Sequence, residues 1–210
     1  MMTVIITVTA VISILITAAI IYQEERRSPG VVNVKNRILI DVPFISQYPP
    51  GTSWKETKNC CQTSYLMLKS FYEGTKPAIN DIKSIDDWIY KNMNKPVNNY
   101  NGTPLFLREL KNVAAGHGRF KAKYEKYYTY KKLIRSLERN IPIIASVYYP
   151  SPGAPEKKIH HSLVIAGIDN EFIWVNDPGR TYGKNIKYPI TDFTSYWEMC
   201  QREVLIIESR

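Results

Sequence analysis

The order of the hydrophobic patterns along the chain limits the folds that it can adopt. Between residues 60 and 139, apolar residues recur at helical spacing in segments bounded by Gly, Pro and hydroxyl residues. From residue 143 onward, most apolar segments are short and rich in β-branched and aromatic residues, which is typical of strands. Helices followed by strands favour an α+β domain with an antiparallel sheet over a doubly wound parallel sheet.

These patterns predict individual elements. Helices are expected from Cys60 to Gly74, from a cap at Asn80 or Asp81, from Thr103-Pro104 to Gly116, over Lys131–Arg139, and from a cap at Thr191. Strands are expected at Arg37–Val42, Ile143–Tyr149, His161–Asp169, Glu171–Asn176 and Val204–Glu208. The segments Asn94–Gly102 and Tyr149–Lys158 are expected to be surface loops.

The first 22 residues contain no charged side chain. Such a run is long enough to span a bilayer, which takes roughly 20 helical residues. No Lys or Arg precedes it, and it exceeds the ~7–15 apolar residues usual in a cleaved signal peptide, so a retained anchor is favoured. The sequence therefore predicts a transmembrane anchor or uncleaved signal at 1–22, a linker at 23–36 and one folded domain at 37–210.

Two arguments about membrane orientation disagree. Arg26, Arg27, Lys35 and Arg37 all follow the predicted span, and the positive-inside rule then places the domain in the cytoplasm. A hydrophobic N-terminus before a soluble domain more commonly directs that domain out of the cytoplasm. We expect a single-pass membrane protein with an extracytoplasmic domain, and the charge distribution keeps the other side open.

The net charge of +9 is concentrated between Arg119 and Arg139, where tyrosines lie among the cations. A nucleic-acid surface has this composition, and so does a surface that contacts anionic lipid. Because no nucleic-acid motif accompanies the charge, we favour an ordinary basic surface and expect no nucleic-acid partner. We expect a monomer that contacts the bilayer through residues 1–22.

Cys60 is the first candidate for chemistry. The chain has only two other cysteines, Cys61 and Cys200, which is too few for a disulfide framework, and neighbouring cysteines are poorly placed to bond each other. Cys60 lies at the expected start of a helix, where the helix dipole stabilises a thiolate. A buried, unreactive cysteine is the alternative. Cys61 points about 100° away around the helix and is expected to pack in the core.

A thiolate enzyme also needs a base and a residue that orients it. His160 and His161 precede an expected strand, so their rings point to opposite faces, whereas His117 lies in a glycine-flanked turn and is expected to be exposed. Asp177 ends the next strand. A hairpin through residues 169 and 170 would bring His161 and Asp177 to the same end, but their spacing fits only if a bulge or bend intervenes. Asp177 can alternatively be a turn residue that binds its own backbone.

A zinc site is a competing use of some of these residues. Cys60, Cys61, His160 and His161 supply four possible ligands. Their adjacent pairing lacks the gap of two to four residues that lets two side chains reach one ion. We therefore expect no metal.

Four segments, in order, resemble the papain-like cysteine peptidases related to the bacteriocin-processing, double-glycine-cleaving enzymes. They are Asp41–Gln47 (DVPFISQ), Asn59–Met67 (NCCQTSYLM), His161–Asp169 (HSLVIAGID) and Val175–Pro178 (VNDP). The resemblance extends over residues 41–208. It implies a papain-like fold whose N-terminal helices pack on an antiparallel sheet.

The resemblance also implies roles for single residues. Cys60 corresponds to the nucleophile, His161 to the base, Asp177 to the residue that orients the base, and Gln47 to the oxyanion donor; no cofactor is implied. Two positions depart from the family pattern, because Cys61 and Gln62 replace its usual Gly and Pro. The expected function is a membrane-anchored thiol peptidase acting on a peptide or protein. A thiol acyl or amide transferase with the same triad and an inactive peptide-binding module are the alternatives.

Overall fold

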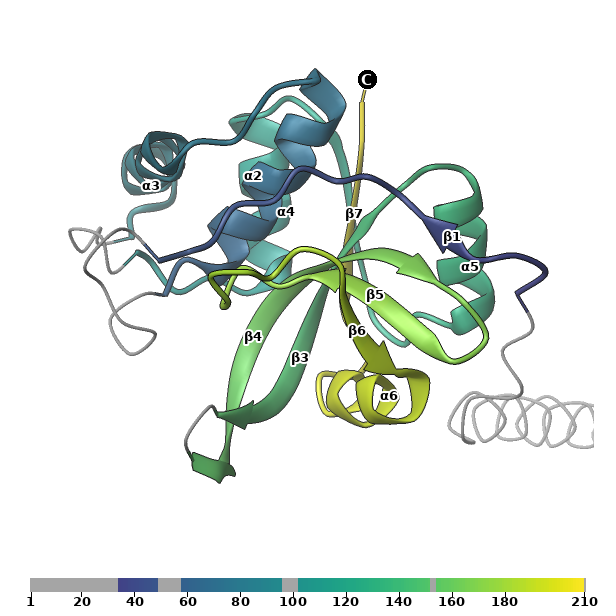
Figure 1. Ribbon diagram of the computed structural model, residues 1–210. Helices are drawn as coiled ribbons and strands as arrows, with labels where there is room; N and C mark the ends of the chain where they lie inside the picture. The colour runs from purple at the N-terminus through teal and green to yellow at the C-terminus, as the bar shows by residue number, and fades with distance from the viewer. Residues whose placement is uncertain (1–33, 49–57, 96–101, 152–153, 210) are drawn as a thin grey trace, which may run out of the picture. The chain divides into compact units, whose positions relative to one another are not determined.

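The structure is a computed structural model that describes residues 34–48, 58–95, 102–151 and 154–209. The described residues belong to one compact unit (Figure 1). The predicted anchor at 1–22 and most of the predicted linker lie outside them. Within the described ranges, no helix combines the length and the apolar character needed to cross a membrane.

An antiparallel sheet forms the centre of this unit. Its strands are β1 (Ile38–Leu39), β2 (Lys121–Glu125), β3 (Ile143–Ser151), β4 (Ala154–Ile168), β5 (Phe172–Asn176), β6 (Ile186–Pro189) and β7 (Val204–Glu208). Their order is β2-β7-β3-β4-β5-β6, with β1 paired to β4, and each pairing is antiparallel. The α+β architecture expected from the sequence is therefore confirmed.

The helices pack around the sheet in separate groups. They are α2 (Cys60–Glu73), α3 (Ile79–Met93), α4 (Leu107–Gly116), α5 (Tyr130–Glu138) and α6 (Ile190–Glu198). Helices α2, α3 and α4 contact one another, with α2 on β4 and α4 on β2 and β7 (Figure 1). Helix α6 packs apart from them, against β3, β5 and β6. The N-terminus of α2 thus meets the middle of the longest strand.

Helix α2 has the bounds that its sequence predicts. Its first residue is Cys60, and Gly74 ends it in the left-handed conformation with φ of 65°. Glycine is favoured there because it has no Cβ to oppose this conformation. Tyr65, Met67 and Leu68 are fully buried, so the helix is held by its apolar residues.

Three expected helix starts were displaced. Helix α3 begins at Ile79, and the carboxylate of Asp81 accepts a hydrogen bond from the N–H of Ala78 at 2.9 Å. Helix α4 begins at Leu107 and not at Thr103-Pro104, and Glu109 accepts from the N–H of Phe106 at 2.9 Å. Thr191 lies inside the first turn of α6. In α3 and α4 an acidic residue of the first turn, rather than a residue before the helix, satisfies the backbone donor.

The sheet extends further than the sequence predicts. Strands β2 and β6 were not expected, and they are the two ends of the strand order. Such edge strands carry charged residues and lack a continuous apolar run. Strand β4 begins at Ala154, seven residues before the expected start, because it pairs with the long strand β3 as far as Pro150 and Ser151. The expected loop at 149–158 is therefore largely a hairpin, of which residues 152–153 are not described.

Strand β1 lies close to β4 at Gly167, which pairs with Leu39. A methyl group at Gly167 would overlap the carbonyl oxygen of Ile38. Just beyond the pair, the N–H of Ile40 donates to the carbonyl of Ala166 at 2.8 Å. This close approach positions the chain segment that continues to Gln47.

We expect Gly167→Ala to destabilise the domain by about 2 kcal/mol, because β1 has to move away from β4 to admit the methyl group. Urea denaturation of the full chain measures the change in the free energy of unfolding. Gly74→Ala is the control: it meets no atom within 4 Å and adds only the strain of a positive φ, so it should cost about 1 kcal/mol. A smaller loss at Gly167 than at Gly74 would contradict the packing described for β1.

Candidate active site

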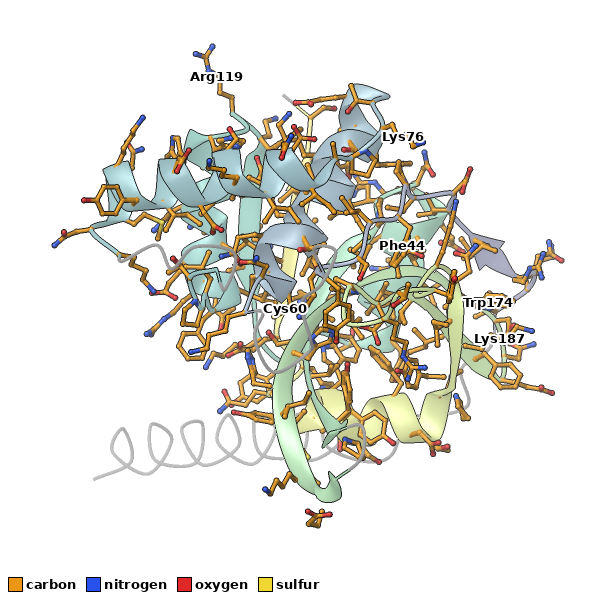
Figure 2. All side chains as sticks on the ribbon, turned by 60° about the vertical axis from the view of Figure 1, so that its left-hand side comes forward. Phe44, Cys60, Lys76, Arg119, Trp174 and Lys187 are labelled. Carbon is orange, nitrogen blue, oxygen red and sulfur yellow. The ribbon has the colours of Figure 1, made fainter. Side chains whose placement is uncertain are left out.

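Cys60 is partly exposed at the N-terminus of α2 (Figure 2). The first turns of the helix are fastened to β4. The thiol of Cys61 lies 3.1 Å from the hydroxyl oxygen of Ser162, and the hydroxyl of Ser64 donates to the carbonyl of Ser162 at 3.2 Å. Cys61 is also 3.0 Å from the carbonyl of Leu105, so it packs inside the domain as its helical position predicts.

The pKa values of the two neighbouring thiols are shifted in opposite directions. The hydrogen bond with Cys61 lowers the pKa of Cys60 most. His161 lowers this pKa further through a hydrogen bond and its positive charge, and so does the backbone N–H of Ser162. Burial acts in the opposite direction but does not outweigh them. The same contact with Cys60, together with burial, raises the pKa of Cys61. Cys60 is therefore the thiol that ionises, while Cys61 keeps its proton.

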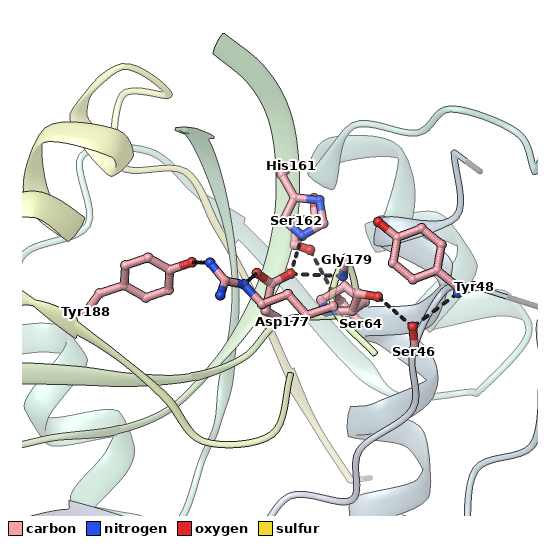
Figure 3. Close-up of polar contacts among 10 residues, drawn as sticks. Ser46, Tyr48, Ser64, His161, Ser162, Asp177, Gly179 and Tyr188 are labelled. Atoms are coloured by element: carbon pink, nitrogen blue, oxygen red, sulfur yellow. Dashed lines mark hydrogen bonds and ion pairs between the residues drawn. The ribbon is translucent and has the colours of Figure 1, made fainter. Parts of the chain in front are cut away.

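His161 and Asp177 meet in the interior. The Nε2 atom of His161 lies 2.8 Å from Oδ1 of Asp177, and the two side chains are 1% and 0% exposed (Figure 3). An ionised carboxylate only accepts hydrogen bonds, so Nε2 carries the proton in this pair. This leaves Nδ1 of His161 for its hydrogen bond with Cys60.

A bulge in the β4–β5 hairpin brings His161 and Asp177 to the same face. Ile168 pairs with Ile173 and Gly167 with Trp174, but the register then shifts by one residue at Ala166, so that Val164 pairs with Asn176. Continued by one residue, this register places Asp177 opposite Leu163, which shares a face with His161. Without the shift, Asp177 would share the face of His160.

His160 indeed points away from this pair. Its ring packs against Phe106, with centroids 5.6 Å apart, and against Tyr148, with centroids 5.2 Å apart. The ring of His161 instead packs in a T-shaped arrangement with the ring of Tyr149, with centroids 5.2 Å apart. His117, which was expected to be exposed, is half-buried, and its Nδ1 lies 3.2 Å from the hydroxyl of Tyr65.

Asp177 is both a partner of His161 and a turn residue. The turn closes with the N–H of Arg180 donating to the carbonyl of Asp177 at 3.2 Å. Oδ1 of Asp177 also accepts from the N–H of Gly179 at 2.9 Å. The two interpretations of Asp177 that the sequence left open are therefore compatible, because the turn holds the carboxylate in place for His161.

The charges of the buried pair stabilise each other. Burial lowers the pKa of His161, but the charge of Asp177 and hydrogen bonds with Asp177 and Cys60 outweigh it and raise the pKa to about 9. Burial raises the pKa of Asp177, but His161, the N–H of Gly179 and Arg180 lower it below its ordinary value. At neutral pH the arrangement favours a Cys60 thiolate beside a protonated His161.

Gln47 is buried beside the turn that carries Asp177. Its N–H donates to the carbonyl of Pro178 at 2.8 Å. The hydroxyl of Ser46 donates to the same oxygen at 3.3 Å (Figure 3). The side chain of Asn176 donates to the carbonyl of Val42 at 3.0 Å. The Gln47 segment and the Asp177 segment are therefore fixed together.

Gln62, which replaces the usual Pro of the resembled family, joins three segments behind Cys60. Its Nε2 donates to Oδ1 of Asp86 in α3 at 3.0 Å and to the carbonyl of Thr103 at 2.7 Å. Gln62 and Asp86 are both buried. Burial raises the pKa of Asp86 to about 6, although the hydrogen bonds from Gln62 and Thr103 oppose the shift.

The zinc alternative has no geometric support in the part of the chain that the structure describes. There, no group of three or more His, Cys, Asp or Glu side chains is arranged to hold a metal ion. Cys60 and His161 face each other, while Cys61 contacts Ser162 and His160 contacts Phe106.

A sequence model described as the peptidase C39-like family matches residues 39–204. The chain belongs to this family. The match includes all four of the proposed site residues, and it agrees with the resemblance noted in the sequence. No curated protein matches this C39-like chain.

Among solved structures, a crystal structure from Bacillus anthracis that is assigned to the C39-like peptidases has the same fold. Its TM-score is 0.62 at 18% sequence identity, and the alignment covers 83% of this chain and 98% of the other. At this identity the likeness concerns the fold. The likeness extends over nearly the whole of the compared chain.

Sequence reasoning missed Arg180 and Tyr188, which surround Asp177. Nε of Arg180 donates to Oδ2 of Asp177 at 3.1 Å, and Nη2 donates to the hydroxyl of Tyr188 at 3.1 Å (Figure 3). The Asp-Pro-Gly-Arg turn was the available signal, because a closed turn places its first and fourth residues side by side. Tyr188 lies on β6, a strand that the sequence did not predict, so it carried no signal.

We expect the buried Asp86 to make stability depend on pH. Its folded-state pKa of about 6 lies above the ordinary value, so folding favours the neutral acid and this stabilisation is lost as pH rises through about 6. Between pH 5 and 7.5, the free energy of unfolding of the wild type should fall by about 1 kcal/mol more than that of Asp86→Asn, which cannot ionise at this position. Urea denaturation at both pH values measures the difference. An equal pH dependence in both proteins would contradict a raised pKa at Asp86.

Proposed function

We propose that this C39-like chain is a thiol peptidase that hydrolyses peptide bonds through Cys60, His161 and Asp177. The observation that carries the proposal is the continuous contact from the Cys60 thiol through the buried His161 ring to the Asp177 carboxylate. We propose further that residues 1–22 hold the enzyme at a membrane. The family match supports a peptidase in general, and the contacts support the cysteine type.

The proposed reaction begins from the thiolate–imidazolium pair. The Cys60 thiolate attacks the carbonyl carbon of the scissile amide, and Gln47 with backbone N–H groups stabilises the oxyanion. His161 then gives its proton to the leaving amine. Water attacks the resulting thioester while His161 takes a proton from it, and the C–S bond breaks. This step releases the carboxylic acid and restores the thiolate–imidazolium pair.

Two features favour activity despite the departures at positions 61 and 62. The Cys61 side chain points into the domain toward Leu105, away from the exposed side of Cys60, so it takes no space from a substrate on that side. The Gln62 amide bonds to Asp86 and Thr103, which holds the first turn of α2 from behind. Replacement of Gly and Pro has therefore been accommodated in the interior.

We expect iodoacetamide to modify Cys60 in the full chain at least about 100-fold faster than Cys200 at pH 6. The pKa of Cys60 is lowered, whereas burial raises the pKa of Cys200 to about 12. Peptide-level mass spectrometry after timed alkylation measures both rates. His161→Ala should slow the reaction of Cys60 and leave that of Cys200 unchanged. Equal rates at the two thiols in the wild type would count against an activated nucleophile.

We expect Gln47→Ala to lower amide hydrolysis about 100-fold, because one oxyanion donor is lost. Alkylation of Cys60 by iodoacetamide passes through no oxyanion, so its rate should stay the same. Cleavage profiling of a peptide library with the full chain measures hydrolysis, and Cys60→Ala sets the background. Equal losses in hydrolysis and alkylation would assign Gln47 to the structure of the site instead of the oxyanion hole.

A further inference from the structure

Arg180 makes a contact that a Cys–His–Asp arrangement does not require. It is the fourth residue of the Asp177 turn, and its side chain is 50% exposed while that of Asp177 is 0% exposed. Nε of Arg180 donates to Oδ2 at 3.1 Å. The carboxylate therefore has a separate partner set for each oxygen, with His161 and Gly179 on Oδ1 and Arg180 on Oδ2.

Tyr188 fixes the other end of the Arg180 side chain. Nη2 of Arg180 donates to the Tyr188 hydroxyl at 3.1 Å, and the guanidinium lies 5.9 Å from the centre of the Tyr188 ring. Tyr188 itself sits on β6 and packs against Phe193 and Tyr196 of α6. The guanidinium is thus held at two points, and such a planar fork loses little freedom when it binds a carboxylate.

The hydrogen bond from Arg180 restrains rotation of the Asp177 carboxylate. A buried carboxylate bound through one oxygen can still rotate about its Cβ–Cγ bond, and rotation would carry Oδ1 away from Nε2 of His161. The charged and titratable groups that face the Asp177–His161 pair are Cys60, His160, Tyr48, Tyr149, Arg180 and Tyr188. Of these groups, Arg180 donates a hydrogen bond to Oδ2 at 3.1 Å.

We propose that Arg180 is a positioning residue that, tied to Tyr188, holds the Asp177 carboxylate in the orientation that His161 uses. The inference rests on the proposed function of the Cys60 site and adds a fourth side chain to it. Arg180 acts through Asp177 and His161 and touches neither the thiol nor the reacting carbonyl. Its effect should therefore appear in the ionisation of Cys60 without any substrate present.

Two substitutions separate the hydrogen bond from the charge. Arg180→Met removes both, whereas Arg180→Gln places an amide nitrogen where Nε lies and keeps a donor to Asp177 without the charge. We expect iodoacetamide to alkylate Cys60 of the Arg180→Met variant about tenfold more slowly than Cys60 of the wild type at pH 5, where the thiolate depends on His161. At pH 9 the two rates should be similar. Arg180→Gln should recover most of the rate.

A spectroscopic measurement on the same full-length proteins keeps the test independent of stability. The His161 Nε2 proton, in a buried hydrogen bond to a carboxylate, should give a downfield proton NMR signal that moves or broadens in Arg180→Met and persists in Arg180→Gln. Lys184→Met is the matched control, since Lys184 is on the same loop, 44% exposed, and paired with Asp41 at 2.7 Å. It should match the wild type in rate and signal.

The inference is overturned if Arg180→Met keeps the wild-type rate and signal. It is also overturned if Arg180→Gln is as slow as Arg180→Met, because the charge alone would then account for the effect. A fall in thermal stability with unchanged rate and signal would assign Arg180 a purely structural role. Failure of the proposed function looks different: in that case wild-type Cys60 would react no faster than Cys200, whatever residue occupies position 180.

Discussion

A single buried carboxylate organises the candidate site. Asp177 has no exposed surface, and removal of an ionised group from water is costly unless each oxygen has partners. His161, the N–H of Gly179 and Arg180 supply them. Because these partners come from β4 and from the turn after β5, the hairpin, the turn and the ring of His161 can only be assembled together. The ionised state of Cys60 in turn depends on the proton that this carboxylate keeps on His161.

Most of the fold could be predicted from the sequence because the strongest patterns in it are local. The bounds of α2 followed from an apolar face between Cys60 and Gly74, and β7 followed from an uninterrupted apolar run. The elements that escaped prediction were those whose stability comes from neighbours. Strand β2 is charged along its sequence and exists because it pairs with β7 along its whole length.

The same distinction applies to the site. Cys60 could be identified locally, since a cysteine that begins an amphipathic helix has a physical reason to ionise. The choice between His160 and His161 could not be made by alternation alone, because alternation separates the two rings without saying which face Asp177 shares. The role of Arg180 could not be predicted for another reason. Its second contact is with Tyr188, which lies on a strand that the sequence did not predict.

The register shift at Ala166 acts as a selector of the base. A strand offers its side chains to two faces in turn, and two neighbouring histidines offer one ring to each face. The bulge decides which of them meets the carboxylate. If β4 and β5 instead continued the pairing of Ile168 with Ile173 without a shift, the ring that now packs against Phe106 would face Asp177, and the present base would lie on the opposite side of the sheet.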